Sequence, residues 1–274
     1  MLTGRIFGIK RMEIHDGEGV RTTVFFKGCP LKCVWCHNPE GISFESSVAK
    51  FEHKCVSCGL CGGRRTGEAA QKCPSGALVY YGKEYGDAEL CDILARDKAF
   101  FDASGGGVTL SGGECLAQPR FAASLARLLR ERGISVYVDT CGYAPREAFD
   151  AIIPYTDKFL YDIKAIDAEV HKRFTGRDNA LILDNLRYLV SHGCKIEVRY
   201  PLVVGYNDGE CEKIGAFLSE LGGIEKIKVL KYHDLAGSRY EALGMENTLP
   251  KTVTQSADVR RAVEMLSSFD LCAE

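Results

Sequence analysis

The sequence predicts an α/β fold: a partial (β/α)6, TIM-like barrel with one small cysteine-rich insert after the first predicted strand. Two observations lead to this prediction. Six apolar, β-branched or aromatic runs recur along the chain, and helix-like segments lie between the later runs, an alternation typical of parallel βαβ units. Six such units form an open or partial barrel more readily than a closed barrel of eight. The length of 274 residues suits one barrel-sized domain with a small insert.

The six runs have the length and composition of buried strands. They span Thr22–Lys27, Gly107–Ser111, Ile134–Thr140, Lys158–Lys164, Lys195–Val203 and Lys226–Tyr232. Apolar residues at helical spacing predict three helices, each with a glycine close to its end as a stop signal. These helices span Phe121–Arg132, Leu183–Ser191 and Lys213–Leu221.

The segment from Lys50 to Lys83 interrupts this alternation. It holds four cysteines and six glycines and shows little apolar periodicity. Because it lacks the residues of a hydrophobic core, we expect a bound ligand to stabilise it. We therefore predict a core domain over residues 1–274 that carries an inserted segment over residues 50–83.

Net charge and hydropathy exclude several functional classes. The formal net charge of −2 argues against a nucleic-acid binder or a polybasic membrane anchor. No apolar run approaches the roughly 18 residues that span a bilayer. The alternation of charged and apolar residues over Met1 to Arg11 is unlike a signal peptide. We therefore expect a cytoplasmic protein with no nucleic-acid or membrane partner.

Cysteine is unusually frequent. The chain has 13 cysteines, and seven of them lie between Cys29 and Cys73. A disulfide scaffold needs an oxidising compartment and usually a short chain, and we expect neither here. Ligation of a metal or an iron–sulfur cluster is the better hypothesis. Five cysteines have no ligand spacing and are expected to be ordinary thiols: Cys91, Cys141, Cys194, Cys211 and Cys272.

Three cysteines follow the first predicted strand in a C-x3-C-x2-C arrangement. Cys29, Cys33 and Cys36 lie in one short loop, where three thiolates can bind three irons of a four-iron cluster. The fourth iron then has no protein ligand and stays open for a substrate, just as a catalytic zinc keeps one position free. The alternative is a structural zinc site with His37 as the fourth ligand.

Four further cysteines lie in the insert. Cys55, Cys58 and Cys61 are spaced C-x2-C-x2-C, and Cys73-Pro74 follows after eleven residues. This pattern resembles a bacterial ferredoxin, in which each fourth cysteine serves the other of two clusters. Two such runs contain eight cysteines. If the fourth to seventh are removed, the first three and the last remain, and these four ligate one complete cluster. The insert is therefore predicted to be ferredoxin-like with one 4Fe–4S cluster, and a zinc knuckle is the alternative.

Polar residues and glycines stand at the ends of the later predicted strands, where catalytic groups of α/β barrels cluster. Glycine pairs allow the backbone to approach a ligand closely. A carboxylate beside them can accept hydrogen bonds from the ammonium group of that ligand. Taken singly, each residue has an ordinary interpretation as a turn, a buried ion pair or a surface histidine. The residues are Gly112, Gly113, Glu114, Asp139, Thr140, Asp162, Ile163, Lys164, Arg199 and His233.

Together these motifs resemble the radical S-adenosylmethionine (SAM) enzymes, whose signature is C-x3-C-x2-C. The closer resemblance is to the glycyl radical enzyme activating enzymes, which include the pyruvate formate-lyase activating enzyme. Their N-terminal signature is similar to the stretch Asp16-Gly17-Glu18-Gly19-Val20-Arg21-Thr22-Thr23, followed by the cysteine loop and Cys36-His37-Asn38-Pro39. The resemblance runs from Phe7 to Gly244 and is broken only in the insert.

Two residues depart from the pattern of this family. Glu18 stands where the family usually has proline, and because the position lies in a loop we expect altered stiffness rather than lost chemistry. Cys115 follows Glu114 where the family commonly has proline, and we expect a small packing role for it.

The resemblance implies an activase. It would bind SAM and two 4Fe–4S clusters and would cleave SAM reductively to methionine and a 5′-deoxyadenosyl radical. That radical would take a hydrogen atom from a glycine of a glycyl radical enzyme, with a flavodoxin or ferredoxin as the reductant. Two alternatives stay open. A radical SAM enzyme acting on a small molecule needs no docking loop, and an electron carrier needs neither the Gly-Gly-Glu element nor His233.

The resemblance also implies roles for individual residues. For the catalytic cluster it implies Cys29, Cys33 and Cys36. For SAM it implies Trp35, Cys36, His37, Gly112, Gly113, Glu114, Asp162, Ile163, Lys164, Arg199 and His233. For a monovalent cation it implies Asp139, Thr140, the Leu160 carbonyl and Asp162. For the glycine loop of the partner enzyme, the candidate contacts are Asp16, Gly17, Gly19 and Arg21.

Overall fold

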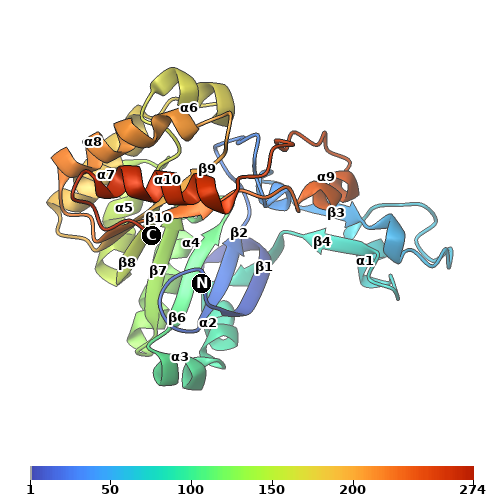
Figure 1. Ribbon diagram of the computed structural model, residues 1–274. Helices are drawn as coiled ribbons and strands as arrows, with labels where there is room; N and C mark the ends of the chain where they lie inside the picture. Colours follow the sequence, from blue (N-terminus) through green and yellow to red (C-terminus); the bar gives the residue numbers. More distant parts are fainter. Residues whose placement is uncertain (1) are drawn as a thin grey trace.

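A central sheet of eight strands and a separate sheet of two form the β-structure of the molecule, a computed structural model that describes residues 2–274 (Figure 1). The central sheet contains β1 (Thr3–Glu13), β2 (Arg21–Phe26), β5 (Lys83–Gly86), β6 (Gly107–Gly112), β7 (Ser135–Thr140), β8 (Lys158–Asp162), β9 (Ile196–Leu202) and β10 (Lys226–Lys231). The small sheet pairs β3 (Ser47–Lys50) with β4 (Leu78–Tyr81). The helices are α1 (Gly67–Gln71), α2 (Asp87–Ala95), α3 (Lys98–Ser104), α4 (Pro119–Glu131), α5 (Arg146–Ile152), α6 (Ala168–Thr175), α7 (Ala180–Ser191), α8 (Cys211–Leu221), α9 (Gly237–Leu243) and α10 (Ser256–Ser267).

The central sheet is mostly parallel, which confirms the predicted α/β class. Its strand order is β10-β9-β8-β7-β6-β2-β1-β5. The six strands from β10 to β2 pair in parallel, whereas β1 pairs antiparallel with both β2 and β5. The sheet is open, with β10 and β5 as its edges. No helix within residues 2–274 is long and apolar enough to cross a membrane.

All six predicted strands are present as β2 and β6 to β10, with ends that shift by at most two residues. The three predicted helices are α4, α7 and α8. The stop signals also agree, because Gly133, Gly193 and Gly222 take positive φ angles where these helices end. Local apolar patterning therefore located the parallel half of the fold.

One prediction about strand order was wrong. The cysteine loop and the insert follow the second strand of the chain, because β1 precedes β2 and pairs with it. The alternating residues of β1 are mostly half-buried or exposed, so this strand lacks the continuous apolar run that identified the buried parallel strands.

Alternation along the parallel strands separates a core face from a polar face. In β7, Val136 and Val138 belong to the hydrophobic core that α4 covers. Tyr137 and Asp139 point to the opposite face, as successive residues of a strand must. Asp139 lies near the carboxyl end of β7, so the polar face carries its charged groups where the parallel strands end.

The segment between β2 and β5 contains the small sheet. Between β3 and β4 lie a short 3-10 helix (Glu52–Lys54) and α1. Figure 1 shows this part projecting away from the central sheet, with α9 beside β3. Two distant parts of the sequence therefore meet outside the central sheet.

Three turns pack backbone to backbone at the carboxyl ends of β2 and β6. The amide of Gly113 donates to the Phe26 carbonyl at 2.8 Å, and the amide of Glu114 donates to the Gly28 carbonyl at 2.8 Å. A Cβ at Gly113 would lie 2.4 Å from the Gly41 carbonyl oxygen and 2.5 Å from that of Gly28. Glycine is therefore required at position 113 for the turn after β6 to approach the cysteine loop.

We expect Gly113→Ala to lower the free energy of unfolding by about 1–3 kcal/mol, because the added methyl group overlaps two backbone carbonyls that cannot move aside independently. Urea unfolding measures this change. Gly209→Ala is the matched control, since a Cβ there meets no atom within 4 Å and its φ is not left-handed. An equal loss in both variants would contradict the steric explanation.

Candidate functional site

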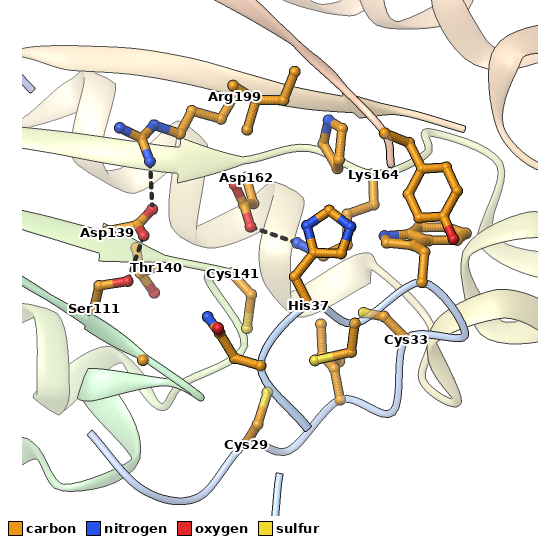
Figure 2. Close-up of a pocket in the computed structure, with 18 of the residues that line it drawn as sticks. Cys29, Cys33, His37, Ser111, Asp139, Thr140, Cys141, Asp162, Lys164 and Arg199 are labelled. Atoms are coloured by element: carbon orange, nitrogen blue, oxygen red, sulfur yellow. Dashed lines mark hydrogen bonds and ion pairs between the residues drawn. The ribbon is translucent and has the colours of Figure 1, made fainter. Parts of the chain in front are cut away.

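A cavity of about 630 Å³ lies where the parallel strands end (Figure 2). The cysteine loop after β2 forms one wall, and residues from β6 to β10 form the other. Fourteen of the residues that the sequence singles out line it: Asp16, Cys29, Cys33, Trp35, Cys36, His37, Gly112, Gly113, Asp139, Thr140, Asp162, Lys164, Arg199 and His233. The lining does not include Ile163, Leu160, Glu114, Gly17, Gly19 or Arg21.

The cysteine loop owes its shape to hydrogen bonds with two neighbouring segments. Gly28 and Cys29 donate their amides to the carbonyls of Gly41 and Ile42, at 2.8 and 3.1 Å. The amides of Lys32 and Val34 donate to carbonyls at the end of α6, at 2.8 and 3.0 Å. These bonds satisfy backbone groups that have no partner in a helix or sheet, and they hold the three thiols against the cavity.

Burial and hydrogen bonding act differently on the pKa values of these three thiols. It raises the pKa of Cys33 and raises that of Cys36 to about 12. A hydrogen bond with the Cys141 thiol lowers the pKa of Cys29. Metal ligation requires thiolates, so binding at this loop would release protons.

The donor set fits a four-iron cluster better than a single ion. No three His, Cys, Asp or Glu side chains within residues 2–274 converge on one point in the way a bound metal ion requires. Zinc needs four ligands around one ion, with sulfur at about 2.3 Å, whereas the thiolates of a cluster bind different irons. His37, the fourth ligand of the zinc alternative, donates from Nε2 to the His233 carbonyl at 2.6 Å, which leaves only its Nδ1 for a metal.

Arg199 connects the two ends of the polar face. Its guanidinium lies 3.5 Å from Asp16 and 3.6 Å from Asp139, and its side chain is 6% exposed. Burial opposes its charge, but the carboxylates of Asp139, Asp16 and Asp162 outweigh that effect and raise the pKa of Arg199. A permanent buried cation therefore lies between the loop before β2 and the end of β7. Figure 2 shows its contact with Asp139.

Lys164 supplies a second buried cation. Its Nζ lies 2.6 Å from Asp162, and its side chain is 8% exposed. Burial lowers the pKa of Lys164, but Asp162 and the nearby thiols reverse that effect and raise it overall. Figure 2 shows this ion pair on the side of the cavity that faces the cysteine loop.

Asp139 accepts a hydrogen bond of 2.6 Å from Ser111. Burial raises the pKa of Asp139 to about 7, with Arg199 opposing the effect. Ser111 and Cys141 both line the cavity and were not among the predicted site residues. Their positions carried a signal, because each is adjacent to a predicted site residue, Gly112 or Thr140.

Glu114 lies beneath the cavity wall. Its carboxylate accepts from the Thr140 hydroxyl at 2.8 Å, from the Cys141 amide at 2.8 Å and from the Leu116 amide at 2.9 Å. Its side chain is buried. Glu114 therefore clamps the ends of β6 and β7 together, and its oxygens already have protein donors.

The stretch from Asp16 to Arg21 is anchored to the polar face. Arg21 is fully buried, donates to Thr109 Oγ1 at 2.8 Å and stacks on Tyr137 at 3.7 Å. Glu18 contacts Lys158 Nζ at 2.8 Å and accepts from the Tyr137 hydroxyl at 3.0 Å. The side chain of Arg21 is thus unavailable to a partner, and Glu18 supplies an ionic tether where proline would supply stiffness.

The four cysteines of the insert are all accessible to solvent to some degree. Cys58 is exposed, while Cys55, Cys61 and Cys73 are partly exposed. Cys73 contacts the Ser75 hydroxyl at 3.7 Å. The structure does not gather the four thiols around one ion within residues 2–274.

Comparison with known proteins gives the family. A sequence model of the Radical SAM superfamily matches residues 23–218. The chain is 37% identical to the choline trimethylamine-lyase activating enzyme of Oleidesulfovibrio alaskensis, over 97% of this chain and 95% of that one. It is 38% identical to the pyruvate formate-lyase 2-activating enzyme of Escherichia coli, over 95% and 88%.

Solved structures agree with this result. A domain of a pyruvate formate-lyase-activating enzyme from Bacteroides vulgatus is 28% identical, with a TM-score of 0.53 over 62% of this chain and 98% of that one. QueE from Escherichia coli shares the fold at 13% identity, with a TM-score of 0.55 over 100% and 93%. The chain therefore belongs to the Radical SAM superfamily and, within it, to the glycyl radical enzyme activating enzymes.

Proposed function

We propose that this chain is an activase that cleaves SAM reductively and abstracts a hydrogen atom from a glycine of a partner glycyl radical enzyme. The observation that carries this proposal is the convergence of three thiols, two buried cations and their carboxylates on one cavity. Membership of the activating-enzyme family supports both the reaction and the kind of partner.

In this proposal Cys29, Cys33 and Cys36 hold a 4Fe–4S cluster at the cavity wall. When bound and reduced, such a cluster would supply the one electron needed to cleave SAM into methionine and a 5′-deoxyadenosyl radical, the species that would take hydrogen from glycine Cα. The sequence offers no general acid or base for this chemistry, and none is needed. The task of the protein is to position the reactants and exclude water.

The charged lining suits the amino-acid end of SAM. Lys164 and Arg199 are the cations for its carboxylate, and the carboxylates of Asp139 and Asp162 are available to its ammonium or to a monovalent cation. The Leu160 carbonyl and Thr140 complete the proposed cation site. Glu114 acts indirectly, because it orients Thr140 and the Cys141 amide.

An apolar wall suits the nucleoside end. Trp35, Val203 and Tyr232 form a small buried cluster beside the cysteine loop. The His37 ring stacks on the His233 ring, with centroids 4.2 Å apart. These flat surfaces would exclude water from the reacting atoms, as a carbon radical requires.

The stretch from Asp16 to Gly19 is the proposed contact for the glycine loop of the partner. Asp16 lines the cavity and contacts Arg199, so a peptide bound there would lie against the SAM site. Gly17 and Gly19 let the stretch pack tightly against Tyr137 and Gly106, and Arg21 anchors it to Thr109.

The insert over residues 50–83 is proposed to be a ferredoxin-like segment within the barrel-like core domain of residues 1–274, holding a second 4Fe–4S cluster at Cys55, Cys58, Cys61 and Cys73. The C-x2-C-x2-C…C-P spacing supports this proposal. A flavodoxin or ferredoxin would be the reductant, and the cytoplasm would be the location.

Reduction of the anaerobically reconstituted protein in the presence of SAM should yield 5′-deoxyadenosine, and Cys33→Ala should abolish it by removing one cluster ligand. Cys272→Ala, at an exposed cysteine, is the control. Adding a candidate glycyl radical enzyme should then produce a glycyl radical EPR signal. Absence of 5′-deoxyadenosine would overturn the enzyme assignment. Its formation without a glycyl radical on any candidate would favour a small-molecule substrate.

Replacing Cys55, Cys58, Cys61 and Cys73 together by alanine should remove about four irons per chain, the content of one 4Fe–4S cluster. The EPR change caused by SAM should persist, because the catalytic ligands are intact. Iron analysis and EPR of the reconstituted protein measure both effects. Bound zinc, with no loss of iron in the variant, would identify a zinc knuckle instead.

Glu18→Gln should destabilise the metal-free protein at neutral pH by a fraction of 1 kcal/mol, since the Glu18 side chain is 60% exposed and its ion pair is screened. Its hydrogen bond with Lys158 lowers the pKa of Glu18 from the ordinary 4.5. The stabilisation is therefore complete above pH 4.5 and is lost as the pH falls through the lowered folded-state pKa.

Urea unfolding of wild type and Glu18→Gln from pH 7 down to pH 3, at low and high salt, tests whether the stabilisation by Glu18 is lost as the pH falls. Glu212→Gln, at an exposed residue of α8, serves as the control. A stability difference that stays constant through the acidic range would refute the ion-pair tether.

A further inference from the structure

The segment from His233 to Pro250, here called the strap, follows β10 and lies across the cysteine loop. It contains α9 and lies outside residues 23–218, the part that the superfamily model matches. Beyond His233, the strap carries polar side chains that the proposed function does not use. Its side chains are directed at the backbone of the loop that bears the cluster ligands.

Three side chains of the strap donate to three carbonyls of the cysteine loop. The Tyr240 hydroxyl donates to the Cys36 carbonyl at 3.0 Å. The Arg239 guanidinium donates to the His37 carbonyl at 3.1 Å. The Thr248 hydroxyl donates to the Val34 carbonyl at 3.1 Å. The peptide that carries the third ligand thiol is thus held from one side by a single segment.

The strap also fixes the residues that follow Cys36. Arg239 reaches the side-chain oxygens of Asn38 at 3.2 Å and Glu40 at 3.3 Å. The Glu40 side chain is only 7% exposed, and its Oε2 has no hydrogen-bond partner among the described residues. Arg239 is therefore the cation in direct contact with this buried carboxylate, with Lys27 also nearby, and removing it would leave Glu40 poorly satisfied.

His233, the first residue of the strap, makes a further contact with the cysteine loop. The His37 Nε2 donates to the His233 carbonyl at 2.6 Å, and the two imidazole rings stack with an interplanar angle of 8°.

The opposite side of the strap faces the cysteine-rich insert. α9 packs against β3, and Arg65 of the insert donates to the Ala242 carbonyl at 3.4 Å. Figure 1 shows α9 next to β3, apart from the central sheet. The strap is therefore the layer between the insert and the loop of the catalytic cysteines.

We propose that the strap sets the position of the Cys33–Cys36 turn relative to the SAM cavity, with Tyr240 and Arg239 as its positioning residues. This inference rests on the proposed function, because it concerns how tightly the cluster site holds SAM. When the donors are lost, the Cys36 and His37 carbonyls can rotate toward water. The Cys36 thiolate and the His37 ring, which both line the cavity, then lose their fixed orientation.

The test is an EPR titration of the reduced, reconstituted holoenzyme with SAM, which reports binding to the catalytic cluster without turnover. Tyr240→Phe and Arg239→Met together should weaken the apparent SAM affinity about tenfold, the effect of removing one or two net hydrogen bonds. Arg239→Lys, combined with native Tyr240, should recover most of the affinity, since an ammonium can still donate to the His37 carbonyl.

Matched controls separate positioning from general destabilisation. Tyr155→Phe removes the hydroxyl of a partly buried tyrosine outside the strap and the cysteine loop. Arg127→Met removes an exposed ion pair with Glu131 on α4. Both should leave the SAM affinity unchanged. Hydrogen exchange of peptides spanning residues 33–41 should accelerate in the strap variants and not in these controls.

The outcomes are distinguishable. A wild-type signal that SAM does not alter would overturn the proposed function and this inference with it. A normal wild-type response with unchanged affinity in the double variant would overturn the strap alone. Equal weakening in the controls, or no recovery with Arg239→Lys, would also count against positioning. Weakened affinity that Arg239→Lys recovers, in variants that still fold and bind the wild-type amount of iron, is the supporting result.

Discussion

Parallel pairing of six strands is the constraint on which the site depends. Because neighbouring parallel strands end at the same edge, the side chains that close each strand must gather there. The register places Asp162 of β8 directly beside Arg199 of β9. A slip of one residue in any pair would turn these side chains to the core face. The apolar residues of the strands therefore fix where the charges lie, although they touch none of the reacting groups.

The buried charges in the cavity are already paired with one another. Arg199 lies between Asp16 and Asp139, and Lys164 lies against Asp162. A zwitterionic ligand can exchange these partners for its own carboxylate and ammonium, so that no buried charge is left alone when the site fills or empties. This arrangement also explains why Arg199 contacts the candidate partner stretch and the SAM cavity together.

Sequence reasoning located what depends on local pattern and missed what depends on distant contacts. The continuous apolar runs identified every parallel strand, and ligand spacing selected Cys29, Cys33 and Cys36, which share one cavity. β1 was not predicted as a strand, because its residues are mostly half-buried or exposed and form no continuous apolar run. Residue type could not show that the Glu114 carboxylate faces protein donors, and nothing periodic in the strap marks Tyr240, whose role exists only where the chain returns to Cys36.

The glycine at position 113 also limits how this sequence can evolve. Its obstacles are the backbone carbonyls of Gly28 and Gly41, so no second substitution at a neighbouring side chain can make room for a larger residue. Gly4 differs, because a Cβ there would meet the Phe121 ring at 2.1 Å, and a smaller residue at position 121 would relieve that overlap. A second substitution can therefore compensate for replacing Gly4, but none can compensate for replacing Gly113, where the turn after β6 meets the cysteine loop.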